Sequence, residues 1–214
     1  MYGHVQKLAE AELAGIKEAG GTADLYRVEE TLSEDVLGKM HAPPKPDIPV
    51  LSDPHTLLQY DAILFGIPTR YGNFPAQWKT FWDKTGGIWQ SGGYWGKMGG
   101  VFIGTGTMGG GQEATAIAAM STFTHHGIIY VPLGYKTTFG ILGDLSEVRG
   151  GSPWGAGTFS VSRPQLYPES RSGSRWLTCF QGGDGSRSPS ELELKLATEQ
   201  GKAFYHHVSK HDFS

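Results

Sequence analysis

The stretch Ala62-Ile63-Leu64-Phe65-Gly66-Ile67, followed at once by Pro68-Thr69-Arg70-Tyr71-Gly72-Asn73, decides the fold. The first six residues form a continuous apolar run, which is typical of a strand buried on both faces of a parallel sheet. The six residues after it are polar or turn-forming, so they predict a loop at the carboxyl end of that strand. Ligands of open parallel α/β sheets bind at this end of the strands.

A second strand and loop repeat this arrangement. Gly100-Val101-Phe102-Ile103 is a buried-strand candidate, and it is followed by Gly104-Thr105-Gly106-Thr107-Met108-Gly109-Gly110-Gly111-Gln112-Glu113. The two loops offer backbone N–H groups and hydroxyls, and they contain no charged catalytic cluster. Together they predict a cradle for a flat polar cofactor at one edge of the sheet.

The second loop also satisfies the dinucleotide pattern G-x-G-x-x-G between Gly104 and Gly109. A dinucleotide fold needs an acidic residue about 20 positions later to bind the ribose. Residues 114–143 contain no Asp or Glu, and the pattern belongs after the first strand of such a fold rather than a middle one. The pattern alone therefore does not indicate a dinucleotide site.

Helical periodicity predicts helices on either side of these strands. In the first helix Glu10 and Glu12 fall off the apolar stripe, and before the last one Ser188-Pro189-Ser190-Glu191 is interpreted as a capping box. The alternation predicts one doubly wound α/β domain over 1–214, with a tail at 209–214. The expected helices are 5–19, 32–40, 53–60, 75–84, 113–123 and 189–208, and further strands are expected at 23–28 and 128–132.

Composition excludes several classes of protein. The chain has 214 residues, a net charge of -3 and 18% charged residues, so nothing favours binding to nucleic acid or an anionic membrane. Its single cysteine, Cys179, excludes a disulfide framework and a cysteine metal site, and no metal site is expected. No apolar run reaches membrane-spanning length and no signal peptide opens the chain, so we expect a cytoplasmic protein.

Three motifs carry a resemblance to a known family: Pro-Thr-Arg-Tyr-Gly-Asn-Phe-Pro-Ala-Gln at 68–77, the second loop at 104–113, and Gly-Gly-Asp-Gly-Ser-Arg at 182–187. They resemble the WrbA-type NAD(P)H:quinone oxidoreductases, especially fungal members described as minor mould allergens. The resemblance implies a flavodoxin-like sheet of order 2-1-3-4-5 that binds FMN. It also implies two-electron, ping-pong hydride transfer from NADH or NADPH to a small-molecule quinone, protection against oxidative stress, and a homo-oligomer, either a dimer or a tetramer.

The resemblance also assigns roles to residues. Catalytic roles fall to His125, with His126 as a less favoured choice, and to Tyr135, while Tyr2, Trp89 and Tyr135 are assigned to the substrate side. The N-terminal positions stand at the start of the first helix, where the helix dipole favours a phosphate, although an ordinary turn is the alternative. The implied cofactor contacts are Tyr2, Gly3, His4, Val5, Pro68, Thr69, Arg70, Tyr71, Gly72, Asn73, Gly104, Thr105, Gly106, Thr107, Met108, Gly109 and His125.

The chain departs from the family pattern at two places. The family opens with a central strand ending in Tyr-Ser ahead of the residue that is Met1 here, so we expect that strand to be missing and the chain to fold poorly or to bind FMN weakly. Residues 161–181 interrupt the family pattern, and their codon possibilities suggest a retained intron, with a genuine surface loop as the alternative. Two functions other than a quinone reductase also stay open: a flavodoxin-type single-electron carrier, and a non-catalytic family member.

Overall fold

The computed structural model describes residues 2–160 and 187–213, so the predicted insert at 161–181 lies outside the described residues. The α-helices are α1 (His4–Glu18), α2 (Glu34–Lys39), α3 (Ala76–Asp83), α4 (Gly86–Ser91), α5 (Gln112–His126), α6 (Phe139–Leu142) and α7 (Glu191–Val208). The strands are β1 (Arg27–Val28), β2 (Val50–Leu51), β3 (Ala62–Pro68), β4 (Met98–Thr105), β5 (Ile129–Tyr130) and β6 (Gly157–Phe159), with a 3₁₀ helix η1 at Pro54–Gln59.

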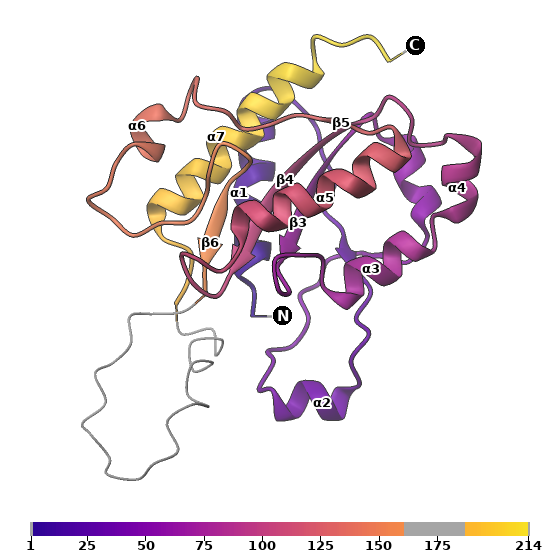
Figure 1. Ribbon diagram of the computed structural model, residues 1–214, viewed down its shortest axis with the longest axis horizontal. Helices are drawn as coiled ribbons and strands as arrows, with labels where there is room; N and C mark the ends of the chain where they lie inside the picture. The colour runs from indigo at the N-terminus through magenta and orange to yellow at the C-terminus, as the bar shows by residue number, and fades with distance from the viewer. Residues whose placement is uncertain (1, 161–186, 214) are drawn as a thin grey trace.

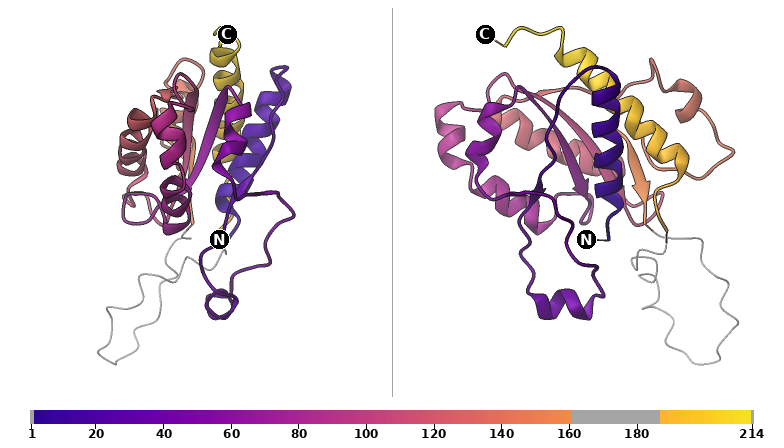
Figure 2. Two further views of the ribbon diagram at one scale, coloured as in Figure 1. Left: turned by 90° about the vertical axis from the view of Figure 1, so that its right-hand side faces the viewer. Right: turned by 180° about the vertical axis from the view of Figure 1, so that it is seen from behind.

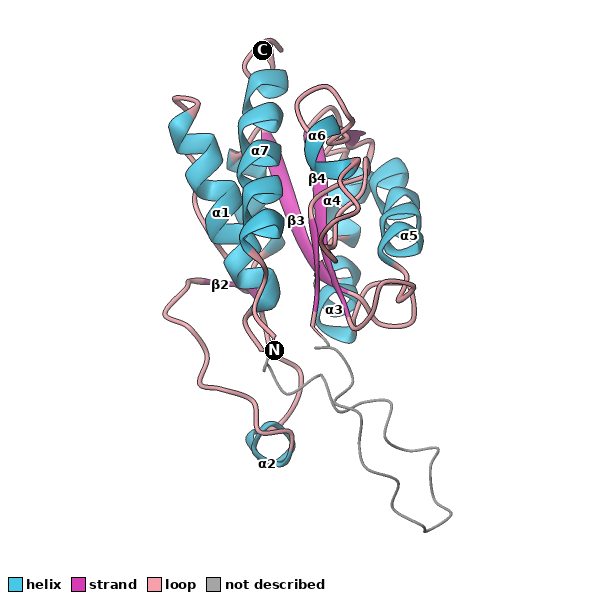
Figure 3. Cartoon of the chain, turned by 90° about the vertical axis from the view of Figure 1, so that its left-hand side faces the viewer, coloured by secondary structure: helices cyan, strands magenta, loops and turns pink. Residues whose placement is uncertain are grey.

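The elements form three layers. Figure 3 shows α1 and α7 on one side of β3 and β4, with α3 and α5 on the other side. The short helix α2 stands away from these layers at the carboxyl end of the strands (Figures 1 and 2). No helix in the described ranges is long and apolar enough to cross a membrane.

The strands are parallel, which confirms the predicted α/β fold. β3 and β4 pair over seven positions, from Ala62 opposite Met98 to Pro68 opposite Gly104. The other edge of β4 pairs with β5 near its start and with β6 near its end. β1 and β2 form a separate two-stranded parallel sheet, so the single sheet of order 2-1-3-4-5, with its first strand ahead of Tyr2, stays a prediction.

Contacts at both ends show that β1 and β3 run in the same direction. Tyr26, just before β1, shares a hydrogen bond of 2.8 Å between hydroxyl oxygens with Tyr60, just before β3. Past the other end, Gln77 of α3 donates to the Glu30 carboxylate, which follows β1, at 2.7 Å. Hence β1 and β3 are two parallel strands of one layer that do not pair with each other.

The core has one part on each side of β3 and β4. On the side of α3 and α5, the ring of Phe65 lies 4.9 Å from that of Phe123, and Trp78, Phe81 and Trp82 are buried around them. The three aromatic residues of α3 therefore belong to the core. On the other side, Leu8, Phe102 and Leu196 are buried between α1, α7 and the sheet.

Glycine allows α1 and α7 to pack closely. A Cβ on Gly15 would lie 2.1 Å from the carbonyl oxygen of Thr198, and one on Gly201 would lie 2.2 Å from the carbonyl oxygen of Glu12. No side chain fits at either position, so the backbones of the two helices meet directly. This contact seats α1 against the sheet and sets where its first turn lies.

Two sequence interpretations were wrong in detail. The capping box of α7 is formed by Ser190 and Glu193, not by Ser188 and Glu191, because Glu193 is drawn into a buried ion pair. Glu12, expected to lie off the apolar stripe of α1, is only 2% exposed because α7 covers it.

Several boundaries also differ. The strand expected at 23–28 is reduced to β1 and that at 128–132 to β5, because each finds only two residues to pair with. The helix expected at 113–123 continues through His126 and is stopped by Gly127, which adopts a φ of 70°. Elements β2, α4, α6 and β6 were not predicted.

Candidate functional site

A cavity of about 1170 Å³ opens at the carboxyl ends of the strands and continues between β1 and β3. Its walls at that end come from the two predicted loops and from the start of α1, so segments far apart in sequence converge as expected. Gly72, Asn73, Met108 and Gly109 lie in the same loops but are not among the lining residues. The predicted site residues that line it are Tyr2, Gly3, His4, Val5, Pro68, Thr69, Arg70, Tyr71, Gly104, Thr105, Gly106 and Thr107.

The first turn of α1 is open to an anion. Its N-cap, Gly3, has a φ of 82°, and no side chain in the described part of the chain caps the helix. The leading N–H groups therefore face the cavity together with the positive end of the helix dipole. The ring of His4 is buried, and its Nε2 contacts the carbonyl oxygen of Arg187. Burial lowers the pKa of His4, so near neutral pH this ring anchors the helix without adding charge.

The loop after β3 is a tight turn held by its own backbone. Arg70 and Asn73 exchange N–H···O bonds of 2.9 and 3.0 Å across it, while Tyr71 and Gly72 adopt φ values of 55° and 77°. Positive φ at both central positions is typical of a type I′ turn. The turn leaves the Tyr71 ring 98% exposed at the cavity mouth, where it offers an aromatic face.

The two loops contact each other. The hydroxyl of Thr69 accepts from the Gly72 N–H at 3.1 Å and shares a 2.7 Å bond with the hydroxyl of Thr115 on α5. A Cβ on Gly111 would lie 3.2 Å from the Cα of Gly72, which is a tight contact, and the φ of 92° at Gly111 also favours glycine. The loop after β4 is also closed by a bond from the Thr105 hydroxyl to the Thr107 carbonyl at 3.0 Å. The cradle is therefore preformed rather than assembled by a ligand.

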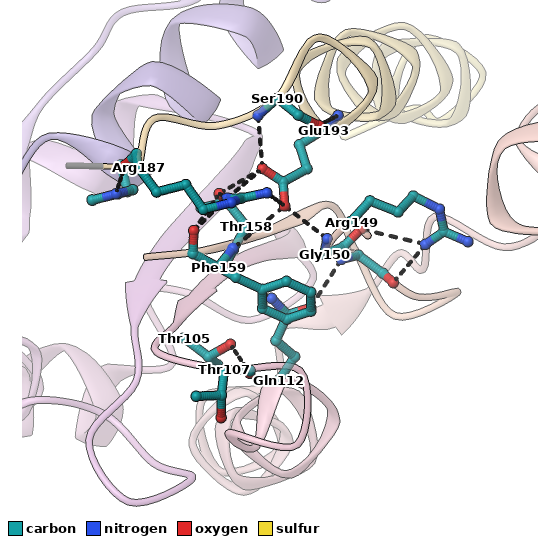
Figure 4. Close-up of polar contacts among 12 residues, drawn as sticks. Thr105, Thr107, Gln112, Arg149, Gly150, Thr158, Phe159, Arg187, Ser190 and Glu193 are labelled. Carbon is teal, nitrogen blue, oxygen red and sulfur yellow. Dashed lines mark hydrogen bonds and ion pairs between the residues drawn. The ribbon is translucent and has the colours of Figure 1, made fainter. Parts of the chain in front are cut away.

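A buried polar network supports the end of β6 beside this cradle (Figure 4). The Glu193 carboxylate accepts from the Gly150 N–H at 2.8 Å, the Thr158 hydroxyl at 2.8 Å and the Arg187 guanidinium at 2.9 and 3.0 Å. The next residue after β6, Ser160, donates its N–H to the Thr105 carbonyl at 2.8 Å. The network thus fixes the end of β6, and Ser160 after β6 is hydrogen-bonded to Thr105 at the start of the second loop.

Sequence reasoning missed this network. The motif before α7 indicated a helix start, which is a local property. That Glu193, Arg187 and Thr158 meet depends on the packing of α7 against β6, and no spacing in the sequence indicates it. Thr158 and Ser160 also line the cavity, so they join the candidate site.

Three predicted residues lie away from the cavity. His125 is exposed in the last turn of α5, where its Nδ1 is 2.7 Å from the carbonyl oxygen of Ser121. A helix of 15 residues spans about 22 Å, so His125 lies far from the loop at the start of α5. Trp89 on α4 and Tyr135 are 56% and 52% exposed and do not line the cavity.

The neighbouring His126 has a different environment. It is buried, its Nε2 lies 3.0 Å from the hydroxyl of Thr85, and burial lowers its pKa. Its ring packs 5.4 Å from that of Trp82. His126 is therefore a core residue, which leaves His125 as the histidine of this pair that a ligand can reach.

The residues present fit FMN. The uncapped first turn of α1 suits its phosphate, and the loops at 68–71 and 104–107 surround the space beside that turn with backbone groups, hydroxyls and one aromatic ring. No metal-binding cluster of His, Cys, Asp or Glu occurs among residues 2–160 and 187–213. The groups that line the site therefore suit an organic phosphate that carries a flat ring.

Comparison with known proteins agrees with this geometry. The chain is 63% identical over 213 residues to minor allergen Cla h 7 of Davidiella tassiana, covering 99% of this chain and 94% of the relative. It is 54% identical over 210 residues to NAD(P)H quinone oxidoreductase PST1 of Candida albicans, covering 98% and 94%. A WrbA-like flavodoxin from Agrobacterium tumefaciens shares the fold, with a TM-score of 0.59, 21% identity and coverage of 99% and 94%. The model of the NADPH-dependent FMN reductase family matches residues 3–138, and the chain belongs to this family.

Proposed function

We propose that this protein is an FMN-dependent NAD(P)H:quinone oxidoreductase. The observation that carries the proposal is the convergence of the uncapped α1 terminus and the two glycine-rich loops at one end of the cavity. Relatives at 54% and 51% identity bear the name NAD(P)H quinone oxidoreductase. These names favour this activity over electron carriage between proteins.

Residues of this chain would divide the work of holding FMN. The first turn of α1, through the N–H groups of His4 and Val5, would bind the phosphate. The loop from Thr69 to Tyr71 and the loop from Gly104 to Gly109 would border the ring. Arg70 is exposed and donates to the Thr69 carbonyl at 3.0 Å, so its charge stays beside the ring and would favour electron-rich forms of the cofactor. Bound FMN supplies the acceptance of hydride from NADH or NADPH and its delivery to a quinone.

We further propose that the active enzyme is a homo-oligomer, a dimer or a tetramer, in which His125, Trp89 and Tyr135 face the site of a neighbouring subunit. The support is their position: all three are exposed and none lines the cavity of its own chain. Trp95, which follows α4 in the sequence, is 79% exposed as well, and two exposed tryptophans in this segment are consistent with a partner surface. His125 or Tyr135 of the adjacent copy would donate a hydrogen bond to the quinone oxygen.

The cellular role follows from the reaction. Reduction of a quinone by two electrons in one ping-pong cycle bypasses one-electron products that react with oxygen, so we propose protection against oxidative stress. We also propose a cytoplasmic location, where NADH and NADPH are available.

The first test is cofactor retention. The purified protein is mixed with FMN and passed through gel filtration while its visible absorption is recorded. Flavin bands that stay with the protein support the proposal. The absence of any FMN binding to correctly folded protein, also in a fluorescence titration that detects weak binding, refutes it. Arg70→Ala is expected to weaken FMN retention and quinone reduction, whereas Lys79→Ala, an exposed change on the outer face of α3, is the matched control.

A complementation test addresses the shared site. Subunits carrying Arg70→Ala and subunits carrying His125→Ala are each expected to be poor enzymes, and mixed oligomers are expected to regain activity because some sites then contain neither change. Failure to regain activity in oligomers shown to exchange subunits would place Arg70 and His125 at the same subunit's site.

A further inference from the structure

One buried histidine, His126, lies where α3, α4 and the carboxyl end of α5 meet at one edge of the molecule (Figure 1). Its ring lies 5.4 Å from the ring of Trp82 and 5.2 Å from that of Tyr94, and its Nε2 contacts the hydroxyl of Thr85. These four buried residues are called the His126 cluster. None of them lines the cavity, so the cluster is separate from the cofactor cradle.

The exposed residues that we place at the subunit face are each attached to this cluster. His125 is the chain neighbour of the buried histidine. The Trp89 N–H donates to the Thr85 carbonyl at 2.8 Å, so Thr85 sets the first turn of α4. The ring of Trp95 lies against Gly127, where a Cβ would be only 2.3 Å from it. The geometry of the cluster therefore sets how these exposed side chains lie relative to one another.

The hydrogen bonds of the cluster determine which nitrogen of His126 carries the proton. The Thr85 hydroxyl lies 2.7 Å from the Trp82 carbonyl, and a carbonyl oxygen can only accept, so the hydroxyl donates its one proton there. Towards His126 the same oxygen can therefore only accept, and Nε2 must donate across the 3.0 Å contact. Neutral His126 is thus the Nε2–H tautomer, with a bare lone pair on Nδ1.

Nδ1 makes His126 intolerant of a second proton. This atom is buried, and no residue within the described ranges offers it a hydrogen-bond partner; the same holds for the Trp82 Nε1–H beside it in the cluster. A proton on Nδ1 would leave a charged donor buried without an acceptor, which is costly. Burial accordingly lowers the pKa of His126, and the neighbouring His125 lowers it further.

The charged residues on the elements around the cluster do not compensate that charge. Lys79 and Asp83 of α3 pair with each other, and Lys84 pairs with Glu29. Lys97 donates to the carbonyls of the segment that ends η1. Helix α4 contains no charged residue, and Glu113 stands at the opposite end of α5. Within the described part of the chain, a protonated His126 ring would therefore have no carboxylate to pair with.

We propose that His126 is the positioning residue of the subunit face: as the neutral Nε2–H tautomer it ties the end of α5 to the start of α4 and so fixes His125 relative to Trp89. Uptake of a proton at Nδ1 drives the ring towards water and breaks the bond to Thr85. The inference rests on the proposed function, in which His125 and Trp89 complete the site of a neighbouring subunit. His126 acts only through these neighbours.

The first experiment reads the ring directly in the protein without FMN. Nitrogen-15 NMR of the imidazole groups, assigned by comparison with His126→Gln, is expected to show a protonated Nε2 and a bare Nδ1 near neutral pH. A proton on Nδ1 at that pH would overturn the proposal. This readout does not depend on the proposed reaction.

The second experiment measures the tie, also without FMN. His126→Leu and Thr85→Val each remove one side of the bond, and both are expected to speed amide hydrogen exchange of Trp89 in α4 by more than ~10-fold while β3 stays protected. Thr85→Ser keeps the hydroxyl, and His126→Gln places an amide N–H near the position of Nε2, so both are expected to stay close to wild type. Unchanged exchange of Trp89 in both disruptive variants would overturn the proposal.

The third experiment uses the FMN-loaded oligomer with a simple benzoquinone. His126→Leu and Thr85→Val are expected to raise the KM for the quinone about 5-fold, the factor that one hydrogen bond typically contributes, with FMN retention unchanged. His126→Gln is expected to keep the wild-type KM near neutral pH and to lose part of the rise in KM on acidification, whereas His206→Gln, an exposed histidine of α7, keeps all of it. An unchanged KM in both disruptive variants would refute the positioning role, while a wild type that binds no FMN would refute the proposed function and leave the first two experiments to decide on the tie.

Discussion

Replacement of Glu193 by Gln should destabilise this protein far more than its position near a helix end suggests. The carboxylate is fully buried and accepts from the backbone of Gly150, from Thr158, from both terminal nitrogens of Arg187 and from the Ser190 N–H. Glutamine keeps the shape but turns one acceptor into an NH₂ group that faces these donors. The guanidinium then stays partly buried without its counter-charge.

The size of the loss follows from that arrangement. Removing one partner of a buried ion pair costs about 3–5 kcal/mol. Against a total stability of about 5–15 kcal/mol this is a large share, so the variant should unfold at markedly lower urea while the slope of the transition stays the same. Because Ser160 beside the network holds the Thr105 carbonyl, the variant should also bind FMN less tightly.

Glu191→Gln is the matched control. Glu191 is exposed in the first turn of the same helix, so its replacement loses only a favourable interaction with the helix dipole, about 0.3–1 kcal/mol. Ser190→Ala should lower the free energy of unfolding by about 1 kcal/mol, because it removes the N-cap of α7, whereas Ser188→Ala should change it little. Equal losses for the two glutamates in urea denaturation would show that the buried network does not carry the stability assigned to it.

Three further outcomes are expected. Gly15→Ala should destabilise the protein in thermal denaturation, because the new Cβ would collide with the Thr198 carbonyl. The control Gly38→Ala should be neutral or stabilising, because a Cβ at this position of α2 meets no atom within 4 Å. A stabilising effect of Gly15→Ala would contradict the close packing of α1 on α7. The contribution of His126 to stability should fall as the pH is lowered through the range in which histidine titrates, because burial lowers the pKa of His126 below that of the unfolded chain. This contribution is present above the unfolded pKa and is lost as the pH falls through the folded pKa, and it is measured as the difference between the wild type and His126→Gln. His126→Gln should flatten this part of the profile, and an unchanged slope would count against it. Saturating FMN at about 100 times its dissociation constant should raise the unfolding free energy by about 2.7 kcal/mol. A melting temperature that does not change when FMN is added would argue against the cofactor site.

The sequence alone determined those features that depend on neighbouring residues. Apolar runs at 62–67 and 100–103 predicted buried parallel strands, and turn-forming residues after each predicted loops at the same edge of a sheet. The motifs in these loops also identified the family, which the family comparison confirmed. These predictions succeeded because the periodicity of side chains and the chemistry of turns are local properties of the chain.

Only the tertiary structure decided which residues meet. Glu12 looked like a surface residue of α1, yet the packing of α7 buries it, and Glu193 rather than Glu191 closes the capping box because Arg187 and Thr158 meet it. The same holds for His125, whose place in the last turn of α5 removes it from its own cavity. Burial and pairing depend on the contact of segments distant in sequence, and the local pattern of one helix carries no information about what covers it.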